Sequence, residues 1–461
     1  MIKILWGFHF KENMMLKKIC ILLSLLAVFH VLAKDKVFKN IKPIQVTLLA
    51  EITAQGQKVN AVALEYEDNI LSGSDLRKTY QISTALNGEE FIPRTILRAY
   101  VNNEPTLSAQ PKIGKFVIIE LDNQDKNADL YSLKTENNQP MQFKGRDKDG
   151  NVIVIEKKQI NKVPQYYGEK LIYQINQIGY LKLTNGKTLD KIQLMQPAIL
   201  EHVKTPWLDQ FAVKSVYLKD KANFLNYRIF TPHFETGKTY PLTIFLHGSG
   251  QVGSDNIAHL LSSKGAISTL QYEEGVVLAP QYQSVFDPFD DITKGHQGGI
   301  HWQTENRRDL VLKMIDETLM QYPQIDKTRI YLVGLSRGSE GAVKLLLTRP
   351  HFFAGALLMS GREAYTYEWV DGNATKENLS SIKDIPMWFF HSKEDKISPV
   401  EGSRINVNIL KELHAPNVKY TEFTTEKVGD NGIANDNAHN TWDAVFNSPE
   451  VMQWLLHQKR R

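Results

Sequence analysis

Hydrophobic and polar positions follow two different rhythms along the chain, and the change falls near residue 205. Before it, short runs alternate apolar and polar side chains, separated by clusters of Asn, Asp and Gly. Examples are Val62–Tyr66, Ile96–Val101, Phe116–Leu121 and Val152–Glu156. Such alternation places one face of each strand in a core, and regular turns between short strands are typical of a β-sandwich. Residues 34–205 are therefore expected to form an all-β accessory domain.

After residue 205, nearly continuous apolar runs alternate with longer amphipathic segments. The expected strands are Tyr240–Leu246, Gly275–Ala279, Arg329–Gly334, Phe353–Met359 and Pro386–Phe390. The expected helices are Asn306–Tyr322, Ser339–Leu347 and Glu401–Leu413. Strands that are apolar throughout belong to sheets covered on both faces. The pattern predicts an α/β domain over residues 206–461, with a mostly parallel sheet and helices on both faces.

The first 33 residues have the pattern of a secretory signal peptide. Lys17 and Lys18 precede the apolar run Ile19–Phe29, and Val31–Ala33 offers small residues for cleavage. Residues 1–13 are interpreted as a possible upstream mis-start, since Met14 and Met15 stand directly before the basic pair. The run is shorter than the roughly 20 residues that span a bilayer. A periplasmic or secreted protein without stable membrane insertion is therefore expected, and an uncleaved anchor is the alternative.

Charge and cysteine content exclude several classes of function. The formal net charge is +4, but residues 1–33 contribute four Lys and one Glu, which leaves 51 basic and 50 acidic residues. This balance gives no electrostatic reason to expect nucleic acid binding. Cys20, the only cysteine, lies in the apolar run. Cleavage would leave no thiol, which excludes disulfides, cysteine nucleophiles and thiolate metal sites.

The segment Gly334-Leu-Ser336-Arg-Gly338 matches the nucleophile elbow G-x-S-x-G. It follows an expected strand and opens an expected helix, as that motif requires. Small residues on both sides of the serine relieve crowding in so tight a turn. We therefore expect Ser336 to be a nucleophile exposed at the edge of the sheet.

A serine hydroxyl needs a base, and a third group must orient that base. In this fold the acid and the histidine follow the serine along the chain, on loops after later strands. Asp395 occupies the expected place of the acid, directly after an apolar strand, and Glu394 is the alternative. His439, in a Gly- and Asn-rich loop, is the expected base. The alternatives His414 and His457 lie at a helix end and in the terminal helix.

The remaining candidates surround this triad. The expected oxyanion donors are the backbone N–H of Ser249 or Gly248, with that of Arg337 after the nucleophile. His247, Trp302 and Trp442 are expected to contact substrate. The spacing of acidic residues and histidines in the loop over 287–301 fits no metal-ligand pattern, so no metal site is expected. The triad chemistry requires no cofactor.

Residues 205–458 resemble bacterial α/β-hydrolase-fold esterases, a group that includes predicted peptidases and polyhydroxybutyrate-depolymerase-like esterases. The resemblance rests on four marks, namely the segment 247–256 beginning His-Gly-Ser-Gly, the segment 325–331, the elbow, and Trp442 three residues after His439. The first half is similar to the immunoglobulin-like N-terminal domain of EstA-type esterases. The resemblance implies an ester hydrolase with Ser336, Asp395 and His439 as its triad.

One departure from these esterases concerns specificity. They commonly have Met-Gly-Gly after the serine, where this chain has Arg337-Gly338-Ser339. The sequence therefore suggests that Arg337 biases the pocket toward acidic or hydroxyl-rich substrates.

The expected function is hydrolysis of a carboxylic ester, small or polymer-borne, through an acyl-enzyme. Two alternatives remain at this point: a peptidase with the same triad, and a polysaccharide- or envelope-binding protein with a vestigial hydrolase domain.

Overall fold

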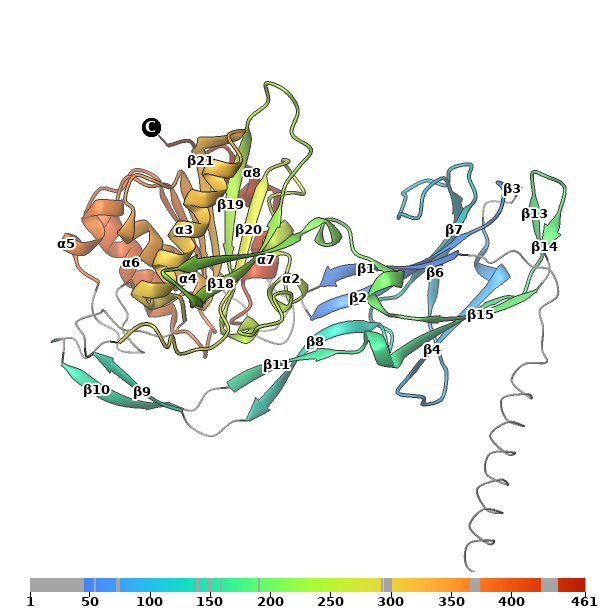
Figure 1. Ribbon diagram of the computed structural model, residues 1–461, viewed down its shortest axis with the longest axis horizontal. Helices are drawn as coiled ribbons and strands as arrows, with labels where there is room; N and C mark the ends of the chain where they lie inside the picture. Colours follow the sequence, from blue (N-terminus) through green and yellow to red (C-terminus); the bar gives the residue numbers. More distant parts are fainter. Residues whose placement is uncertain are drawn as a thin grey trace, which may run out of the picture.

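The computed structural model describes residues 45–460 apart from 54, 72–74, 138–140, 147–148, 150, 158–159, 190, 292, 294–300, 365–373 and 424–437. The expected signal peptide lies outside the described residues and stays a prediction. Within them, an all-β domain is followed by an α/β domain, side by side (Figure 1). This confirms the expected fold class. Of the helices in the described part of the chain, none is long and apolar enough to cross a membrane.

Two packed sheets build the accessory domain. The larger has the path β11-β8-β2-β1-β16, and β7 joins β2 to β6. Its strands are β1 (Gln45–Thr53), β2 (Gly56–Glu65), β6 (Ile96–Asn102), β7 (Phe116–Leu121), β8 (Asp129–Asn137), β11 (Ile160–Tyr166) and β16 (Val203–Lys204). The second has the order β15-β12-β4-β5, with β4 (Tyr80–Leu86), β5 (Ile92–Pro93), β12 (Leu171–Gln177) and β15 (Ile192–Pro197).

The core of this domain joins the inner faces of both sheets. Leu48, Val62 and Ile119 of the larger sheet share one cluster with Ile82 and Ile175 of the second. The alternating sequence pattern produces this core, because successive strand residues point to opposite faces. Two small sheets complete the domain: β3 (Ile70–Leu71), β13 (Leu181–Leu183) and β14 (Thr188–Leu189), and the hairpin of β9 (Met141–Arg146) and β10 (Val152–Lys157).

The second domain is built on one eight-stranded sheet of order β17-β18-β20-β19-β21-β22-β23-β24. Its strands are β17 (Ala212–Leu218), β18 (Asp220–Phe230), β19 (Tyr240–Leu246), β20 (Val276–Gln281), β21 (Ile325–Leu335), β22 (Gly355–Met359), β23 (Met387–Ser392) and β24 (Val418–Phe423). From β20 to β24 every neighbouring pair is parallel, whereas β17 and β18 form an antiparallel extension.

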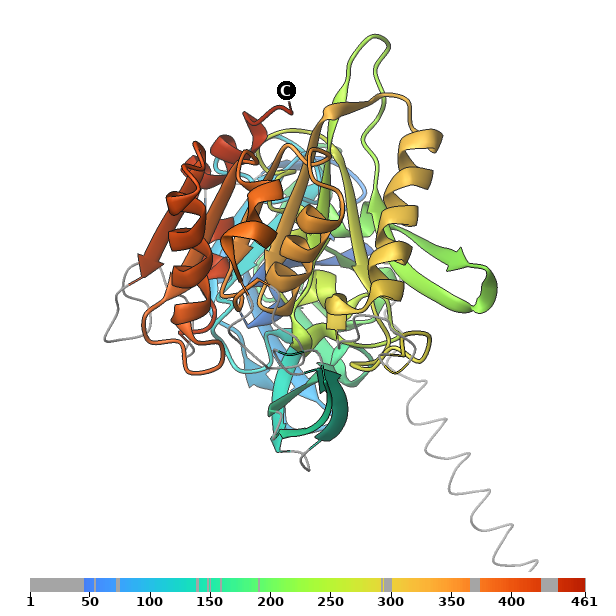
Figure 2. The same cartoon turned by 90° about the vertical axis from the view of Figure 1, so that its left-hand side faces the viewer.

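Helices cover both faces of this sheet (Figure 2). They are α2 (Ala258–Leu261), α3 (Glu305–Gln321), α4 (Arg337–Thr348), α5 (Lys376–Leu379), α6 (Val400–Glu412), α7 (Trp442–Phe446) and α8 (Pro449–Leu456). The three helices expected from periodicity correspond to α3, α4 and α6. Alternate residues of β19 enter different cores: Leu242, Ile244 and Leu246 join one cluster, and Phe245 joins the other. The continuous apolar pattern of the strand follows from this double burial.

The two domains share a hydrophobic contact and a hydrogen bond. Ile52 and Tyr131 of the accessory domain belong to the same cluster as Ala258 of α2. The Tyr166 hydroxyl at the end of β11 donates to Asp255 Oδ2 at 2.8 Å. β11 also contacts η5 (Ser249–Gln251), the short 3-10 helix after β19.

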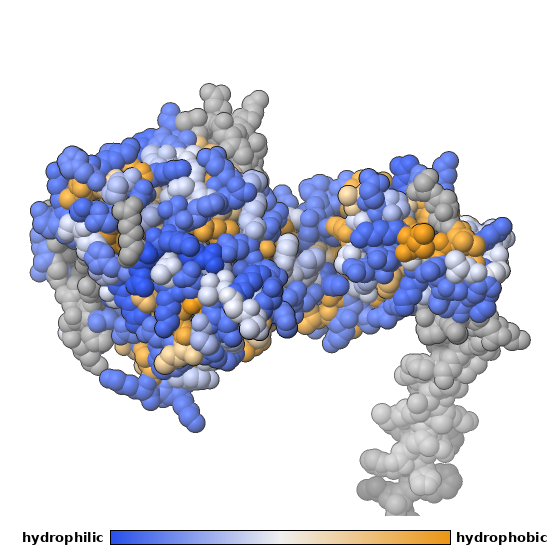
Figure 3. Space-filling model, turned by 90° about the horizontal axis from the view of Figure 1, so that it is seen from above, coloured by the Kyte–Doolittle hydropathy of each residue, from blue (hydrophilic) through white to orange (hydrophobic). Residues whose placement is uncertain are grey.

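The β9–β10 hairpin continues beyond β8 and β11, along the side of the α/β domain where its parallel strands end (Figures 1 and 2). Seen from above, both domains are mainly hydrophilic, and exposed apolar side chains gather most densely on the accessory domain (Figure 3). Leu107 and Ile113 are among the exposed apolar side chains of that domain.

Tyr166→Phe tests the bond between the domains. Asp255 also accepts the backbone N–H groups of Ile257 and Ala258, so losing Tyr166 should loosen this turn. A hydrogen bond contributes about 1 kcal/mol, so amide exchange over residues 249–261 should accelerate by roughly fivefold, as measured by mass spectrometry. Tyr167→Phe is the matched control, because the Tyr167 hydroxyl bonds Ser132 within the accessory domain. Equal exchange in the two variants would contradict the assignment.

Candidate active site

Ser336 lies between β21 and α4 in a strained backbone conformation. Its φ of 51° and ψ of −121° fall outside the regions that L-residues prefer. The backbone N–H of Ser336 donates to Met359 O at 2.8 Å, which helps to hold the turn against β22. Strain of this kind persists where the surroundings enforce it, and it is common at functional sites. The serine is thereby placed at the N-terminus of α4.

Two glycines make this turn possible. A Cβ atom on Gly334 would lie 2.3 Å from Gly338 O, and one on Gly338 would lie 1.9 Å from Leu246 O. Real Cβ atoms do not approach backbone oxygens so closely, so any side chain at either position would push α4 away from β19 and β21. The G-x-S-x-G spacing is therefore a packing requirement.

The three residues expected to form a triad lie in hydrogen-bond contact. His439 Nε2 is 2.9 Å from Ser336 Oγ, and His439 Nδ1 is 2.6 Å from Asp395 Oδ2. A carboxylate oxygen only accepts, so Nδ1 carries the proton and Nε2 accepts from the serine hydroxyl. His439 and Asp395 are buried at 6% and 8% exposure. In this tautomer Nε2 is the ring nitrogen without a proton, and it is the one that faces the Ser336 hydroxyl.

The structure does not bring the alternative residues into this chain of contacts. Glu394 points its backbone N–H at Ser392 Oγ in the turn before Asp395. His414 follows the end of α6 with a φ of 55°, and His457 caps α8 with Nδ1 on Gln453 O. His414 thus has the helix-end position expected of it, whereas His457, expected within the terminal helix, lies at its C-terminal end.

The Asp395 carboxylate is surrounded by donors. Its Oδ1 accepts the backbone N–H groups of Ile397 and Ser398 at 2.8 and 2.9 Å. Its Oδ2 accepts from His439 and also lies 3.1 Å from Nε2 of His391. Burial acts to raise the pKa of Asp395, but the hydrogen bonds from His391 and His439 outweigh it and hold that pKa well below its usual range. The carboxylate therefore stays charged.

His391 was missed by the sequence reasoning. It lies inside the apolar strand β23, where a lone histidine is more simply explained as a core residue. The available signal was its spacing of four residues from Asp395, across a strand end that turns back on itself.

The expected oxyanion donors lie beside the nucleophile. A Cβ atom on Gly248 would stand 3.2 Å from Ser336 Cβ, so Gly248 and Ser249, at the start of η5, border the serine. Arg337 is the first residue of α4, and the first N–H groups of a helix have no partner within it. Both backbone segments thus lie next to the nucleophile, and their role as oxyanion donors stays a prediction.

His247 and Trp302 were expected to contact substrate, but both side chains are buried in the protein. Their exposures are 0% and 2%, and Trp302 Nε1 donates to His247 O at 2.9 Å. His247 Nδ1 lies 2.7 Å from Gly248 O, behind the oxyanion segment. Trp302 also packs closely on α4, because a Cβ atom added to Gly341 would lie only 2.5 Å from Cβ of Trp302. Both residues are built into the core that supports the site. Trp442 stays partly exposed, with its ring edge-on to His439 at 5.3 Å.

Buried uncharged histidines lie around the oxyanion segment. Burial lowers the pKa of His247 to about 3 and that of His259, on α2, to about 4. Burial also holds the pKa of His301 well below its usual value, and its Nδ1 is 2.6 Å from the Tyr282 hydroxyl. These rings are therefore neutral near pH 7 and pack as aromatic groups.

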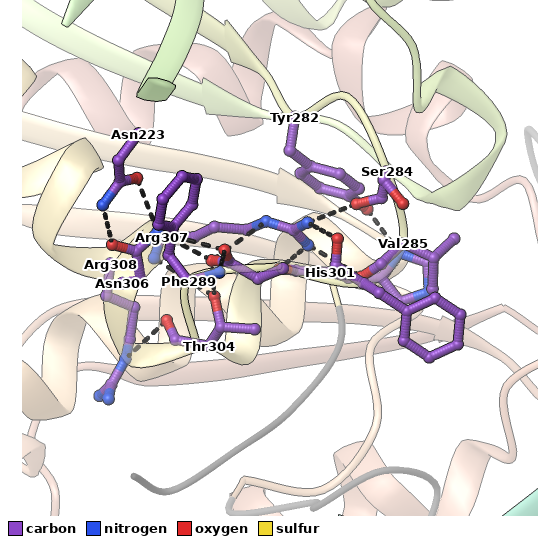
Figure 4. Close-up of polar contacts among 12 residues, drawn as sticks. Asn223, Tyr282, Ser284, Val285, Phe289, His301, Thr304, Asn306, Arg307 and Arg308 are labelled. Carbon is purple, nitrogen blue, oxygen red and sulfur yellow. Dashed lines mark hydrogen bonds and ion pairs between the residues drawn. The ribbon is translucent and has the colours of Figure 1, made fainter. Parts of the chain in front are cut away.

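Arg307 organises the segment that carries His301 and Trp302 (Figure 4). Its guanidinium donates to the backbone carbonyls of Ser284, Val285, Phe286 and His301. Asp287 accepts from Thr304 Oγ1 at 2.8 Å and lies 3.6 Å from Arg307. Asp287, one of the acidic residues of this loop, is thus engaged by the protein itself. Over the described ranges, no group of three His, Cys, Asp or Glu side chains is placed to hold a metal ion.

The side chain of Arg337 does not have the specificity role suggested by the sequence. Its guanidinium is buried and pairs with Glu340, one turn along α4, at 2.5 Å. Gln303 Nε2 donates to the same carboxylate oxygen at 2.9 Å. A guanidinium committed to an internal pair is not free to bind an acidic substrate, so we discard that hypothesis.

Comparison with known proteins agrees with this geometry. Residues 45–190 match the family model described as the esterase Ig-like N-terminal domain, and residues 235–429 match that described as phospholipase/carboxylesterase. The chain is a serine esterase of the α/β-hydrolase fold. A solved structure entitled a thermostable esterase is 26% identical to it, with a TM-score of 0.69, and the match covers 90% of this esterase and all of that chain.

Two further solved structures have lower sequence identity to this esterase. A ferulic acid esterase is 13% identical, covering 47% of this chain and 90% of its own, with a TM-score of 0.34. An acylaminoacyl peptidase is 16% identical, covering 88% and 70%, with a TM-score of 0.38. A comparison with curated proteins finds no match.

Arg337→Met tests the internal pair. Removing one partner of a buried ion pair leaves the other charge uncompensated, so Arg337→Met should lower the free energy of unfolding by roughly 3 kcal/mol. The double variant Arg337→Met/Glu340→Met should recover most of that loss, because no buried charge is left over. Preference between neutral and acidic esters should not change in the single variant. A shift of tenfold toward neutral esters, with stability unchanged, would restore the specificity hypothesis.

Proposed function

We propose that this esterase hydrolyses carboxylic esters through an acyl-enzyme on Ser336, with His439 as general base and Asp395 as the residue that orients it. One observation carries the proposal: the unbroken relay from Ser336 Oγ to His439 Nε2 at 2.9 Å and from His439 Nδ1 to Asp395 at 2.6 Å. The relay gives the serine a base of the correct tautomer, which a hydroxyl nucleophile requires.

The reaction has two halves. Ser336 Oγ bonds to the ester carbonyl carbon while its proton passes to His439 Nε2, and the N–H groups of Ser249 and Arg337 stabilise the oxyanion. The C–O bond to the alcohol then breaks, and His439 returns the proton to the leaving oxygen. In the second half, water attacks the acyl carbon with His439 again as base, and Ser336 leaves with the proton. Ester and water become acid and alcohol, without any cofactor.

Ser336→Ala tests the nucleophile. Loss of a triad serine typically lowers kcat by about 10⁶, so hydrolysis of p-nitrophenyl esters should fall to background. Ser339→Ala, which alters a buried serine one turn further along α4, should keep most of the activity. Assaying matched esters and anilides on the same preparations separates an esterase from a peptidase. Comparable kcat/KM on both bonds, or an active Ser336→Ala protein, would contradict the proposal.

Ser249→Pro tests the oxyanion donors, because proline has no backbone N–H. Removing one such donor costs about 10²–10³ in kcat, and KM should change much less. Ser249→Ala keeps the N–H and removes the exposed hydroxyl, so it should lose less than about threefold if the donor is the backbone. Similar losses in both variants would instead implicate the side chain.

A further inference from the structure

Asp395 serves two histidines. His439 Nδ1 and His391 Nε2 lie 2.6 and 3.1 Å from the same oxygen, Oδ2. The His391 side chain is fully buried. Building on the function proposed above, we propose that His391 is a positioning residue that holds Asp395 toward His439, shares the charge of its carboxylate, and so sets the pH above which His439 works as a base.

The proton on His391 can be assigned from its neighbours. Nε2 faces two groups that only accept, Asp395 Oδ2 and, at 2.9 Å, the carbonyl of Ser398. Nε2 must therefore carry a hydrogen, which these two acceptors share. Nδ1 lies 2.8 Å from the hydroxyl of Ser403 on α6.

Ser403 decides the charge of the ring. Its hydroxyl can donate to His391 Nδ1 at 2.8 Å or to the carbonyl of Gly361, which is 3.5 Å away. An O–H···O bond prefers about 2.7–2.8 Å, so the ring nitrogen is the better acceptor. His391 is then neutral, with its only N–H directed at Asp395 and Ser398.

Three elements fix this arrangement. Strand β23 carries His391, the turn after it carries Asp395 and Ser398, and α6 supplies Ser403. The backbone N–H groups on Asp395 Oδ1 already anchor one oxygen of the carboxylate. His391 acts on the other oxygen, which is the one that His439 uses.

The charged surroundings of His391 are balanced. Glu422 of β24 is in register with His391 of β23. Arg404 of α6 binds both carboxylate oxygens of Glu422, at 2.9 and 2.6 Å. Arg404 therefore neutralises Glu422. In the described part of the chain, Asp395 is instead bound by backbone N–H groups and by the two histidines.

The consequence follows from competition for one oxygen. A donor from His391 withdraws part of the negative charge of Asp395, so His439 holds its extra proton less tightly. Without that donor, protonated His439 is better stabilised and must be brought to higher pH before it can accept a proton from Ser336.

His391→Leu and His391→Gln test this role. The leucine removes the donor, and the acidic limb of the kcat/KM profile should move up by about 0.5–1 pH unit. The glutamine amide can occupy the place of Nε2–H and should keep the limb within about 0.2 pH unit of the wild type. His259→Leu is the matched control: it replaces a fully buried histidine on α2 and should not move the limb, whatever it does to stability.

Two further measurements decide the remaining cases. If His391→Leu does not accumulate as folded protein, Ser403→Ala is the second variant, because it removes the hydroxyl that binds His391 Nδ1. It should move the acidic limb of the kcat/KM profile in the same direction, but by less. The downfield proton NMR signal of His439 Nδ1–H should also move further downfield in whichever variant weakens the His391 bond. An acidic limb and a proton signal that stay at their wild-type positions in folded His391→Leu or Ser403→Ala protein would overturn the role of His391. That result leaves the proposed function standing, whereas a wild-type enzyme without Ser336-dependent esterase activity would remove both.

Discussion

The close approach of helix α4 to the sheet at Gly334 and Gly338 is the constraint on which the site depends. Neither position has room for a Cβ atom, and between them Ser336 adopts a positive φ. This geometry brings the serine beside Gly248, within hydrogen-bond distance of His439, and at the N-terminus of α4. A wider turn would move Ser336 away from Gly248, from His439 and from the N-terminus of α4.

Most titratable side chains around this turn are either neutral or paired with an opposite charge. His247, His259 and His301 are buried and neutral, and Arg337 and Glu340, both in the first turn of α4, neutralise each other. Asp395 is the exception, and its charge is held by two backbone N–H groups and two imidazoles. This charge contacts His439 directly, and buried charges interact more strongly than exposed ones because the local dielectric is low.

Much of this site could be predicted from the sequence, because its parts are local. The strand–turn–helix pattern around Ser336, the strand before Asp395 and the chain order of acid and histidine depend on short segments that carry their own signals. His391 could not be found in this way, since its relation to Asp395 depends on how the turn after β23 folds back. The burial of His247, Trp302 and Arg337 was equally invisible, because it depends on packing between elements that are distant in sequence. Trp302 donates to the carbonyl of His247, and Gln303 binds Glu340, the ion-pair partner of Arg337. The contact of Tyr166 with Asp255 joins two domains, and no local pattern encodes it.

The central claim is that Ser336 is the nucleophile, and a mechanism-based label tests it most directly. The wild-type protein would be treated with a fluorophosphonate, digested, and mapped by tandem mass spectrometry, since this reagent bonds to an activated serine and mimics the tetrahedral intermediate. The account predicts a single stoichiometric adduct on Ser336, formed faster above the acidic limb of the activity profile. An adduct on another residue, or no adduct on an active preparation, would contradict it.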